Sequence, residues 1–186
     1  MRGKWPLVIL LLLTACGYIG VDDPGAYWDK GMTDPMLVGH WRQERADGIR
    51  EKHPTEFTIA VEGGEYVISG ARTNDPPVLG RTLKAGNYTF FMLDPRLGSD
   101  GRARVLYRYT VRSNVLQLYE LDPRDLGDWL LQHCPAQTNL RLGSIPAGTI
   151  KTLDDAVVTI LSEIPDEERY WSRTDGELQR YRRVQH

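Results

Sequence analysis

The sequence predicts a mainly β domain, an antiparallel barrel or strongly curved sheet of seven or eight strands, with two α-helices at about 123–134 and 152–164. Three observations support this prediction. Short runs of alternating apolar and polar residues follow one another from residue 37 onward. Turns of hairpin length separate these runs. Two segments with apolar residues at helical spacing interrupt them.

The clearest strand spans residues 103–112, where two kinds of side chain alternate. One face carries large apolar residues and the other carries arginines (Val105, Tyr107, Tyr109 and Val111 against Arg104, Arg108 and Arg112). A period of two indicates a strand with one face in a core and the other in water. Similar runs predict further strands at 37–44, 57–61, 65–69, 80–84, 87–93, 115–121 and 177–184.

Each predicted helix has a start signal and a stop signal. Asp122 and Pro123 are typical of the N-cap and first position of a helix that ends at Pro135. Thr152 is the expected cap of the second helix, which Pro165 ends. Cys134 lies on the apolar stripe of the first helix, so a buried thiol is favoured over a reactive one.

The first residues predict a signal peptide over 1–15. Arg2 and Lys4 give a positive start, residues 5–13 are apolar, and small residues follow. This apolar run of nine residues is much shorter than the roughly 20 that a membrane-spanning helix needs. Its removal changes the net charge from −2 to −4, so the mature chain is weakly acidic and no nucleic-acid partner is expected.

The segment Leu13-Thr14-Ala15-Cys16 resembles the lipobox of bacterial lipoproteins. The resemblance implies cleavage before Cys16 and a diacylglyceryl group on its sulfur, which would anchor the protein on a membrane. An Asp directly after the lipidated cysteine would resemble a signal that retains lipoproteins in the inner membrane. This chain has Gly17 at that position, so the expected location is the periplasmic face of the outer membrane. The alternative is an ordinary signal peptide that is cut nearby, with Cys16 a free thiol.

Residues 16–36 contain glycines and prolines without a regular period, so we expect a lipidated tether before a domain over 37–186. In that domain, Gly39-His40-Trp41 resembles the Gly-x-Trp signature that opens the barrel of lipocalins. The resemblance implies that Trp41 plugs the closed end of a barrel and that a basic residue of the last strand lies across it. Arg180, Arg182 and Arg183 are available, and Arg182 is the predicted partner of Gly39 and Trp41. The alternative is that Trp41 is a core aromatic residue of another β fold.

No residue pattern predicts catalysis. None of the four histidines (His40, His53, His133 and His186) pairs with another at metal-ligand spacing, so no metal, cofactor or enzymatic activity is expected. Neither a Gly-x-Ser-x-Gly elbow nor a phosphate-binding loop is present in the sequence.

The expected function is therefore binding of a small apolar or amphipathic ligand inside the barrel of a membrane-anchored envelope lipoprotein. The predicted lining consists of large apolar residues of the expected strands: Phe57, Ile59, Tyr66, Ile68, Phe90, Met92, Val105, Tyr107 and Tyr109. The alternative is a filled barrel that docks on another envelope protein, through the arginine-bearing face of 103–112 or the region of helix 123–134.

Overall fold

The computed structural model describes residues 18–44, 55–70, 77–94, 104–141, 147–167, 170–172 and 179–184. The predicted signal peptide and Cys16 lie outside the described residues. Eight antiparallel strands form a closed, lipocalin-like barrel, in which each strand pairs with the next and the last with the first. These strands are β2 (Gly39–Gln43), β3 (Glu56–Glu62), β4 (Glu65–Gly70), β5 (Val78–Ala85), β6 (Tyr88–Asp94), β7 (Arg104–Arg112), β8 (Val115–Leu121) and β12 (Gln179–Arg183).

One end of the barrel carries three hairpins, which join β3 to β4, β5 to β6 and β7 to β8. The 3₁₀ helix η1 (Pro35–Leu37) enters β2 at this same end, which we call the closed end. The opposite end, which we call the mouth, is where β2, β4, β6 and β8 finish and β12 begins. Because neighbouring strands are antiparallel, this division follows directly from the chain order.

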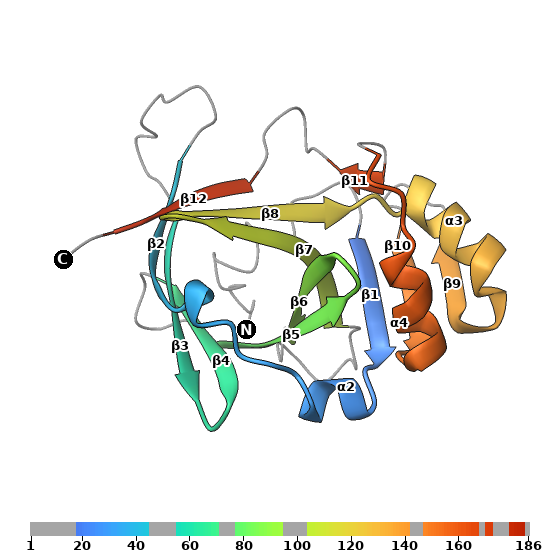
Figure 1. The fold of residues 1–186 in the computed structure, drawn as a ribbon, viewed down its shortest axis with the longest axis horizontal. Helices are drawn as coiled ribbons and strands as arrows, with labels where there is room; N and C mark the ends of the chain where they lie inside the picture. Colours follow the sequence, from blue (N-terminus) through green and yellow to red (C-terminus); the bar gives the residue numbers. More distant parts are fainter. Residues whose placement is uncertain are drawn as a thin grey trace, which may run out of the picture.

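A second layer packs on one side of the barrel (Figure 1). Strand β1 (Tyr18–Asp23) pairs antiparallel with β7 and parallel with β10 (Ala147–Thr152), and β9 (Thr138–Arg141) extends this group. The helices α3 (Asp125–His133) and α4 (Asp155–Ser162) lie on this side, and η2 (Pro135–Gln137) leads into β9. The short strand β11 (Trp171–Ser172) pairs with the end of β8.

The molecule consequently has two hydrophobic cores. The inner core lies inside the barrel and contains Trp41, Phe57, Tyr66 and Tyr107. The outer core lies between the barrel wall and the second layer, where residues such as Leu106 of β7 meet Leu130 of α3 and Leu161 of α4. A strand such as β7 can serve both cores because its successive side chains point to opposite faces.

The two predicted helices are confirmed, with shorter bounds than expected. Asp122 accepts hydrogen bonds from the backbone N–H groups of Arg124 and Asp125, at 2.8 and 3.1 Å, so it satisfies the start of α3 as predicted. The predicted cap of the second helix was wrong. Asp154 caps α4 by accepting from the N–H of Val157 at 2.9 Å, whereas Thr152 ends strand β10.

Residues 18–36 do not form the predicted tether, because the structure places them in the domain. Ile19 and Val21 of β1 are 1% and 0% exposed and belong to the outer core. The backbone N–H of Leu153 donates to the carbonyl of Asp23 at 2.8 Å, which ties the end of β1 to the entry of α4. Pro24, Gly25 and Gly31 lie between short elements, which explains the missing period.

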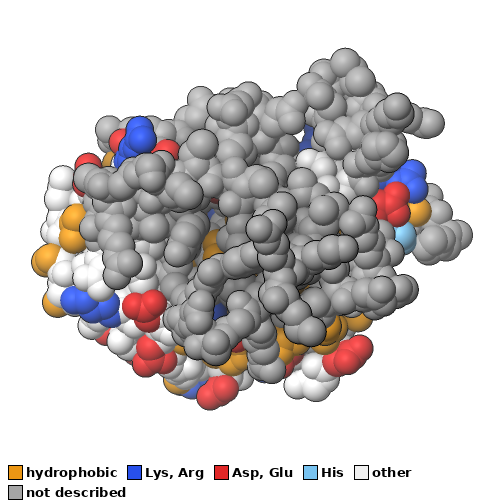
Figure 2. All heavy atoms as spheres, turned by 180° about the vertical axis from the view of Figure 1, so that it is seen from behind, with side chains coloured by type: hydrophobic (Ala, Val, Ile, Leu, Met, Phe, Trp, Pro, Cys, Tyr) orange, Lys and Arg blue, Asp and Glu red, His pale blue; other side chains and the backbone are white. Residues whose placement is uncertain are grey.

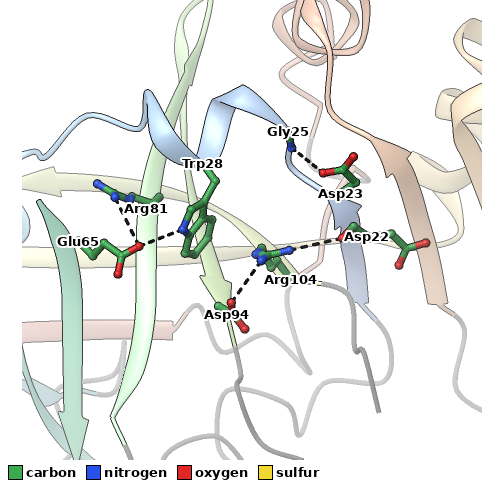
Figure 3. A network of polar contacts seen from close by, with 8 residues as sticks. All are labelled: Asp22, Asp23, Gly25, Trp28, Glu65, Arg81, Asp94 and Arg104. Atoms are coloured by element: carbon green, nitrogen blue, oxygen red, sulfur yellow. Dashed lines mark hydrogen bonds and ion pairs between the residues drawn. The ribbon is translucent and has the colours of Figure 1, made fainter. Parts of the chain in front are cut away.

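The helix α2 (Ala26–Asp29) attaches the same segment to the barrel wall (Figure 3). Trp28 donates from its indole nitrogen to Glu65 of β4 at 3.0 Å, and the guanidinium of Arg104 lies over its ring at 4.8 Å. Arg81 of β5 pairs with the same Glu65 at 3.4 Å, and Arg104 pairs with Asp94 at 3.4 Å. Charged residues on four barrel strands, β4 to β7, therefore hold the N-terminal segment in place.

Within the described ranges, no helix has the length and hydropathy that crossing a membrane would require.

Candidate ligand-binding interior of the barrel

Trp41 closes one end of the barrel. Its side chain is 0% exposed, and its indole nitrogen donates to the carbonyl of Leu37 in η1 at 2.8 Å. The guanidinium of Arg183 lies over the indole ring at 4.7 Å and donates to the carbonyl of Met36. Gly39 has φ +152°, and a Cβ there would lie 3.2 Å from Nε of Arg183, so a glycine suits this contact.

The predicted partner Arg182 was wrong, because Arg183 occupies that position. In β12, Arg183 is directly opposite Trp41, whereas Arg182 points outward and binds Glu44 at 2.8 Å. The hydrogen bond from Arg182 holds the pKa of Glu44 below its usual value. Alternation with the buried Tyr181 would have identified Arg183, because residues two apart share a face of a strand.

The two adjacent arginines provide a matched stability test. Arg183→Ala is expected to lower the free energy of unfolding by about 1–3 kcal/mol, because it removes a cation–π contact and a hydrogen bond at the closed end. Arg182→Ala removes only an exposed ion pair, so no measurable change is expected. Urea unfolding followed by circular dichroism measures both, and equal losses would show that Arg183 does not close the barrel.

Asp34 organises the polar contacts beneath the closed end. Its carboxylate accepts from the N–H of Met36 at 2.8 Å, which caps η1, and from the hydroxyl of Tyr109 at 3.0 Å. The hydroxyl of Tyr66 donates to the backbone carbonyl of Asp34 at 3.1 Å. Burial raises the pKa of Tyr109, and the negative Asp34 raises it further. Both tyrosines therefore remain neutral donors that hold η1 on the barrel.

Seven of the nine predicted lining residues lie in the inner core: Phe57, Ile59, Tyr66, Ile68, Val105, Tyr107 and Tyr109. Their rings meet edge to face with other inner residues. Phe57 lies 4.8 Å from Tyr181 between ring centroids, and Phe91 lies 5.5 Å from Tyr66 and 6.1 Å from Tyr109. This arrangement gives the barrel an aromatic interior with defined packing.

Phe90 and Met92 were placed on the wrong face. Both belong to the outer core, and Phe91 and Leu93 point into the barrel instead. Strand β6 is almost completely buried on both faces, because the second layer covers its outer side. Alternation of apolar and polar residues is therefore absent from Phe90 to Leu93, and the sequence gives no sign of which face is inside.

Glu120 is the inner residue that sequence reasoning missed. It lies opposite Tyr107 in the β7–β8 ladder and follows Leu116 and Leu118 on the inward face of β8. Its side chain is 5% exposed, and Oε1 accepts from the amide of Gln179 of β12 at 2.7 Å. Burial raises the pKa of Glu120 from 4.5 to about 7. The sequence signal was its spacing: Glu120 follows Leu116 and Leu118 at intervals of two, so it shares their inward face of the strand.

The arginine-bearing face of β7 is not the free docking face that the alternative prediction required. Arg108 lies 4.4 Å from the ring centroid of Trp171 and 4.6 Å from that of Tyr88, and it binds Asp166 at 2.7 Å. Arg104 lies against Trp28, as described above. The sheet of the second layer and the segment before β11 cover these arginines, and Arg112 alone of the three is exposed. Leu126 and Leu130 of α3 likewise face the outer core.

Cys134 is 8% exposed and belongs to the outer core, which confirms the predicted burial of its thiol. Among the described residues, no three His, Cys, Asp or Glu side chains form a group that could hold a metal ion. On the face opposite to that of Figure 1, acidic and basic side chains of the described residues lie beside one another at several places along the edge (Figure 2).

No protein-family model, curated protein or solved structure matches this chain.

Proposed function

We propose that this protein is a lipid-anchored lipoprotein of the bacterial cell envelope whose barrel binds a small apolar or amphipathic molecule. The observation that carries this proposal is the composition of the barrel interior. The interior holds the aromatic side chains of Phe57, Tyr107 and Tyr181 together with the buried carboxyl group of Glu120, which lies opposite Tyr107. A ligand site combines such an apolar wall with a few polar groups that orient the ligand.

The chain order supports entry of the ligand at the mouth. The closed end is blocked by Trp41, Arg183 and η1, which contact one another. Glu120 and Gln179 lie at the other end, near the end of β8 and the start of β12. Barrels of about eight strands hold one small ligand or fill themselves with side chains. Polar groups at one end and apolar groups beyond them suit a molecule with a head and a tail.

The anchor would place the domain directly on the bilayer surface. Only Gly17 separates Cys16 from the first residue of β1. Two residue steps span at most about 7 Å of extended chain. Lipid on Cys16 would therefore hold the barrel beside the headgroups, where molecules with an apolar tail are concentrated, rather than on a long tether in the periplasm.

The two cysteines provide a matched test of the anchor. Cys16→Ser is expected to move the protein from the membrane fraction to the soluble fraction, because the acyl chains that hold it are lost. Cys134→Ser changes a buried thiol in the outer core, so this variant is expected to stay with the membrane. Fractionation with intact-mass analysis measures both variants. An unmodified Cys16 in the mature wild-type protein would overturn the anchor.

Ligand binding is tested separately on residues 16–186 with Cys16→Ser, which we call the lipid-free domain and which contains every residue of both cores. The neutral dye N-phenyl-1-naphthylamine should fluoresce in the apolar interior, and dodecanol should displace it. No fluorescence change with the dye and no binding of dodecanol by native mass spectrometry would reject ligand binding.

One observation favours docking on another envelope protein as a second candidate function. Met36, Val38 and Val61 are 43%, 38% and 41% exposed and belong to segments at the closed end of the barrel. Exposed apolar side chains that lie together mark protein contacts more often than isolated ones do. Photo-crosslinking from position 36 in intact cells, with the exposed position 151 on β10 of the second layer as the control, tests this candidate. Recovery of the monomer alone from position 36 would reject it.

A further inference from the structure

Glu120 has a carboxyl oxygen that is buried without a partner. Oε1 accepts from Gln179, but Oε2 has no hydrogen-bond partner in the described structure. Leaving a buried acceptor unsatisfied costs about 1–3 kcal/mol. Glutamate is also one of the residues least often buried without a pair. The hydrogen bond from Gln179 therefore satisfies only one of the two carboxyl oxygens, and Oε2 stays buried without a partner in the described part of the chain.

Among the described residues, no cation compensates this carboxyl group. Within the described ranges, Glu120 forms no ion pair with a lysine, arginine or histidine. The groups near it are neutral: the amide of Gln179 and the hydroxyls of Tyr107 and Tyr181. Burial raises the pKa of Tyr107, and the charge of Glu120 raises it further, so this phenol stays protonated. The described part of the chain therefore supplies no positive charge to Glu120, and a bound cation could supply one.

The described inward-facing residues next to Glu120 on β6, β7 and β8 include apolar side chains. Leu118 precedes it on the inward face of β8, and Val105 and Leu93 face inward on the neighbouring strands β7 and β6. An alkyl or aromatic tail would contact these side chains while its head reaches Oε2. Each buried CH₂ group of such a tail contributes about 0.8 kcal/mol.

We propose that the barrel selects an amphipathic amine, whose ammonium group donates a hydrogen bond to Oε2 of Glu120 and whose tail lies in the inner core. This inference rests on the proposed ligand-binding function and names the class of ligand. A carboxylate accepts hydrogen bonds and cannot donate them, so an alkylammonium head supplies both the missing donor and the missing charge. A fatty acid would place a second negative charge beside the first.

The protonation of Glu120 gives the selection a pH dependence. The amine binds the ionised carboxylate, and with a pKa of about 7 the carboxylate is the minor form at pH 6 and the major form at pH 8. A primary alkylamine remains protonated throughout this range, as a lysine does. Tyr107, which lies opposite Glu120, stays protonated over this range, because burial raises its pKa well above the usual value. The affinity for the amine should therefore rise about tenfold from pH 6 to pH 8.

Three ligands with one tail and different heads test the proposal on the lipid-free domain: dodecylamine, dodecanol and sodium dodecanoate. Displacement of N-phenyl-1-naphthylamine at pH 8 should show dodecylamine binding at least about tenfold more tightly than dodecanoate, the ratio expected for one charge-assisted hydrogen bond. Glu120→Gln should abolish this preference. Glu62→Gln changes an exposed carboxylate of β3, so the preference should remain.

The outcomes separate the two proposals. Equal displacement by all three ligands in the wild type, or an unchanged preference in Glu120→Gln, would overturn the choice of an amine and leave ligand binding intact. Failure of all three to displace the dye, together with no adduct in native mass spectrometry, would overturn ligand binding as well. Thermal melting of each variant confirms that it is folded. A preference that Glu120→Gln alone removes supports both proposals.

Discussion

Trp41→Ala is expected to lower the free energy of unfolding by about 3–5 kcal/mol, the range for removing a large aromatic side chain from a core. Trp41 is 0% exposed, so its removal leaves a cavity at the closed end of the barrel. The change also leaves the carbonyl of Leu37 without its indole donor and Arg183 without the ring on which it lies. These losses act on the same structural unit, η1 with β2 and β12, and the closed end should open before the rest of the barrel.

Two further variants make this prediction specific. Trp41→Phe keeps a ring beneath Arg183 but removes the indole N–H, so a smaller loss of about 1–2 kcal/mol is expected. Trp129→Ala changes a tryptophan of α3 that is only partly buried and stacks on His133, so it should cost less than Trp41→Ala. Urea unfolding followed by circular dichroism measures all three. A loss for Trp41→Ala no larger than that for Trp129→Ala would show that Trp41 does not hold the barrel closed.

Glu120 is expected to make the stability of the protein fall as the pH rises. Burial raises the pKa of its carboxyl group from 4.5 to about 7 in the folded state. Between these values the folded protein holds a proton that the unfolded chain releases, so the contribution of the protonated carboxyl group is complete below pH 4.5 and is lost as the pH rises through 7. The total loss is about 3 kcal/mol, at 1.36 kcal/mol for each pKa unit.

Glu120→Gln isolates this effect from other titrations. Glutamine cannot ionise, so the melting temperature of the variant minus that of the wild type should increase between acidic and alkaline pH. For a domain of this size, about 3 kcal/mol corresponds to a change of roughly 6–12 °C in that difference. Glu62→Gln should show no such trend, because Glu62 is exposed. Calorimetry across the pH range measures these melting temperatures. If the difference between Glu120→Gln and the wild type did not change with pH, burial would not raise the pKa of Glu120.

The barrel could be predicted from the sequence where apolar and charged residues alternate along a strand. Strand β7 alternates inward apolar residues with Arg104, Arg108 and Arg112, although Leu106 and the second layer leave its outer face partly buried. Turn residues separate the β3–β4 and β7–β8 hairpins, so both their existence and their pairing followed from local patterns. The Gly39-x-Trp41 resemblance added the closed end. The same reasoning selected the wrong arginine, because it considered only the type of residue. Arg183, two positions after Tyr181, shares the inward face of β12 with it, whereas Arg182 lies on the outward face.

The second layer could not be predicted, because its signals are not local. Strands β9 and β10 are short, and β1 acquires its partners from residues more than 80 positions away, as in the pairing of Gly20 with Val105. This layer buries the outer side of β6, which removed the alternation that would have assigned Phe90 and Met92. Glu120 is different, since the sequence shows it two residues after Leu118 and four after Leu116, on the same face of the strand. A search for charged residues that share a strand face with apolar residues would have identified it.

The central claim is that a small amphipathic molecule enters the inner core of the barrel and not the outer core. Methyl NMR of the lipid-free domain, labelled at leucine, tests this claim most directly, because leucines report on both cores. Leu116 and Leu118 face the barrel interior, whereas Leu126 and Leu130 lie between α3 and the barrel wall.

Titration with dodecylamine should shift the methyl signals of Leu118 first and those of Leu116 with it, saturating at one molecule per protein, while Leu126 and Leu130 keep their positions. Shifts confined to Leu126 and Leu130, or no shifts while ligand is in excess, would contradict the account.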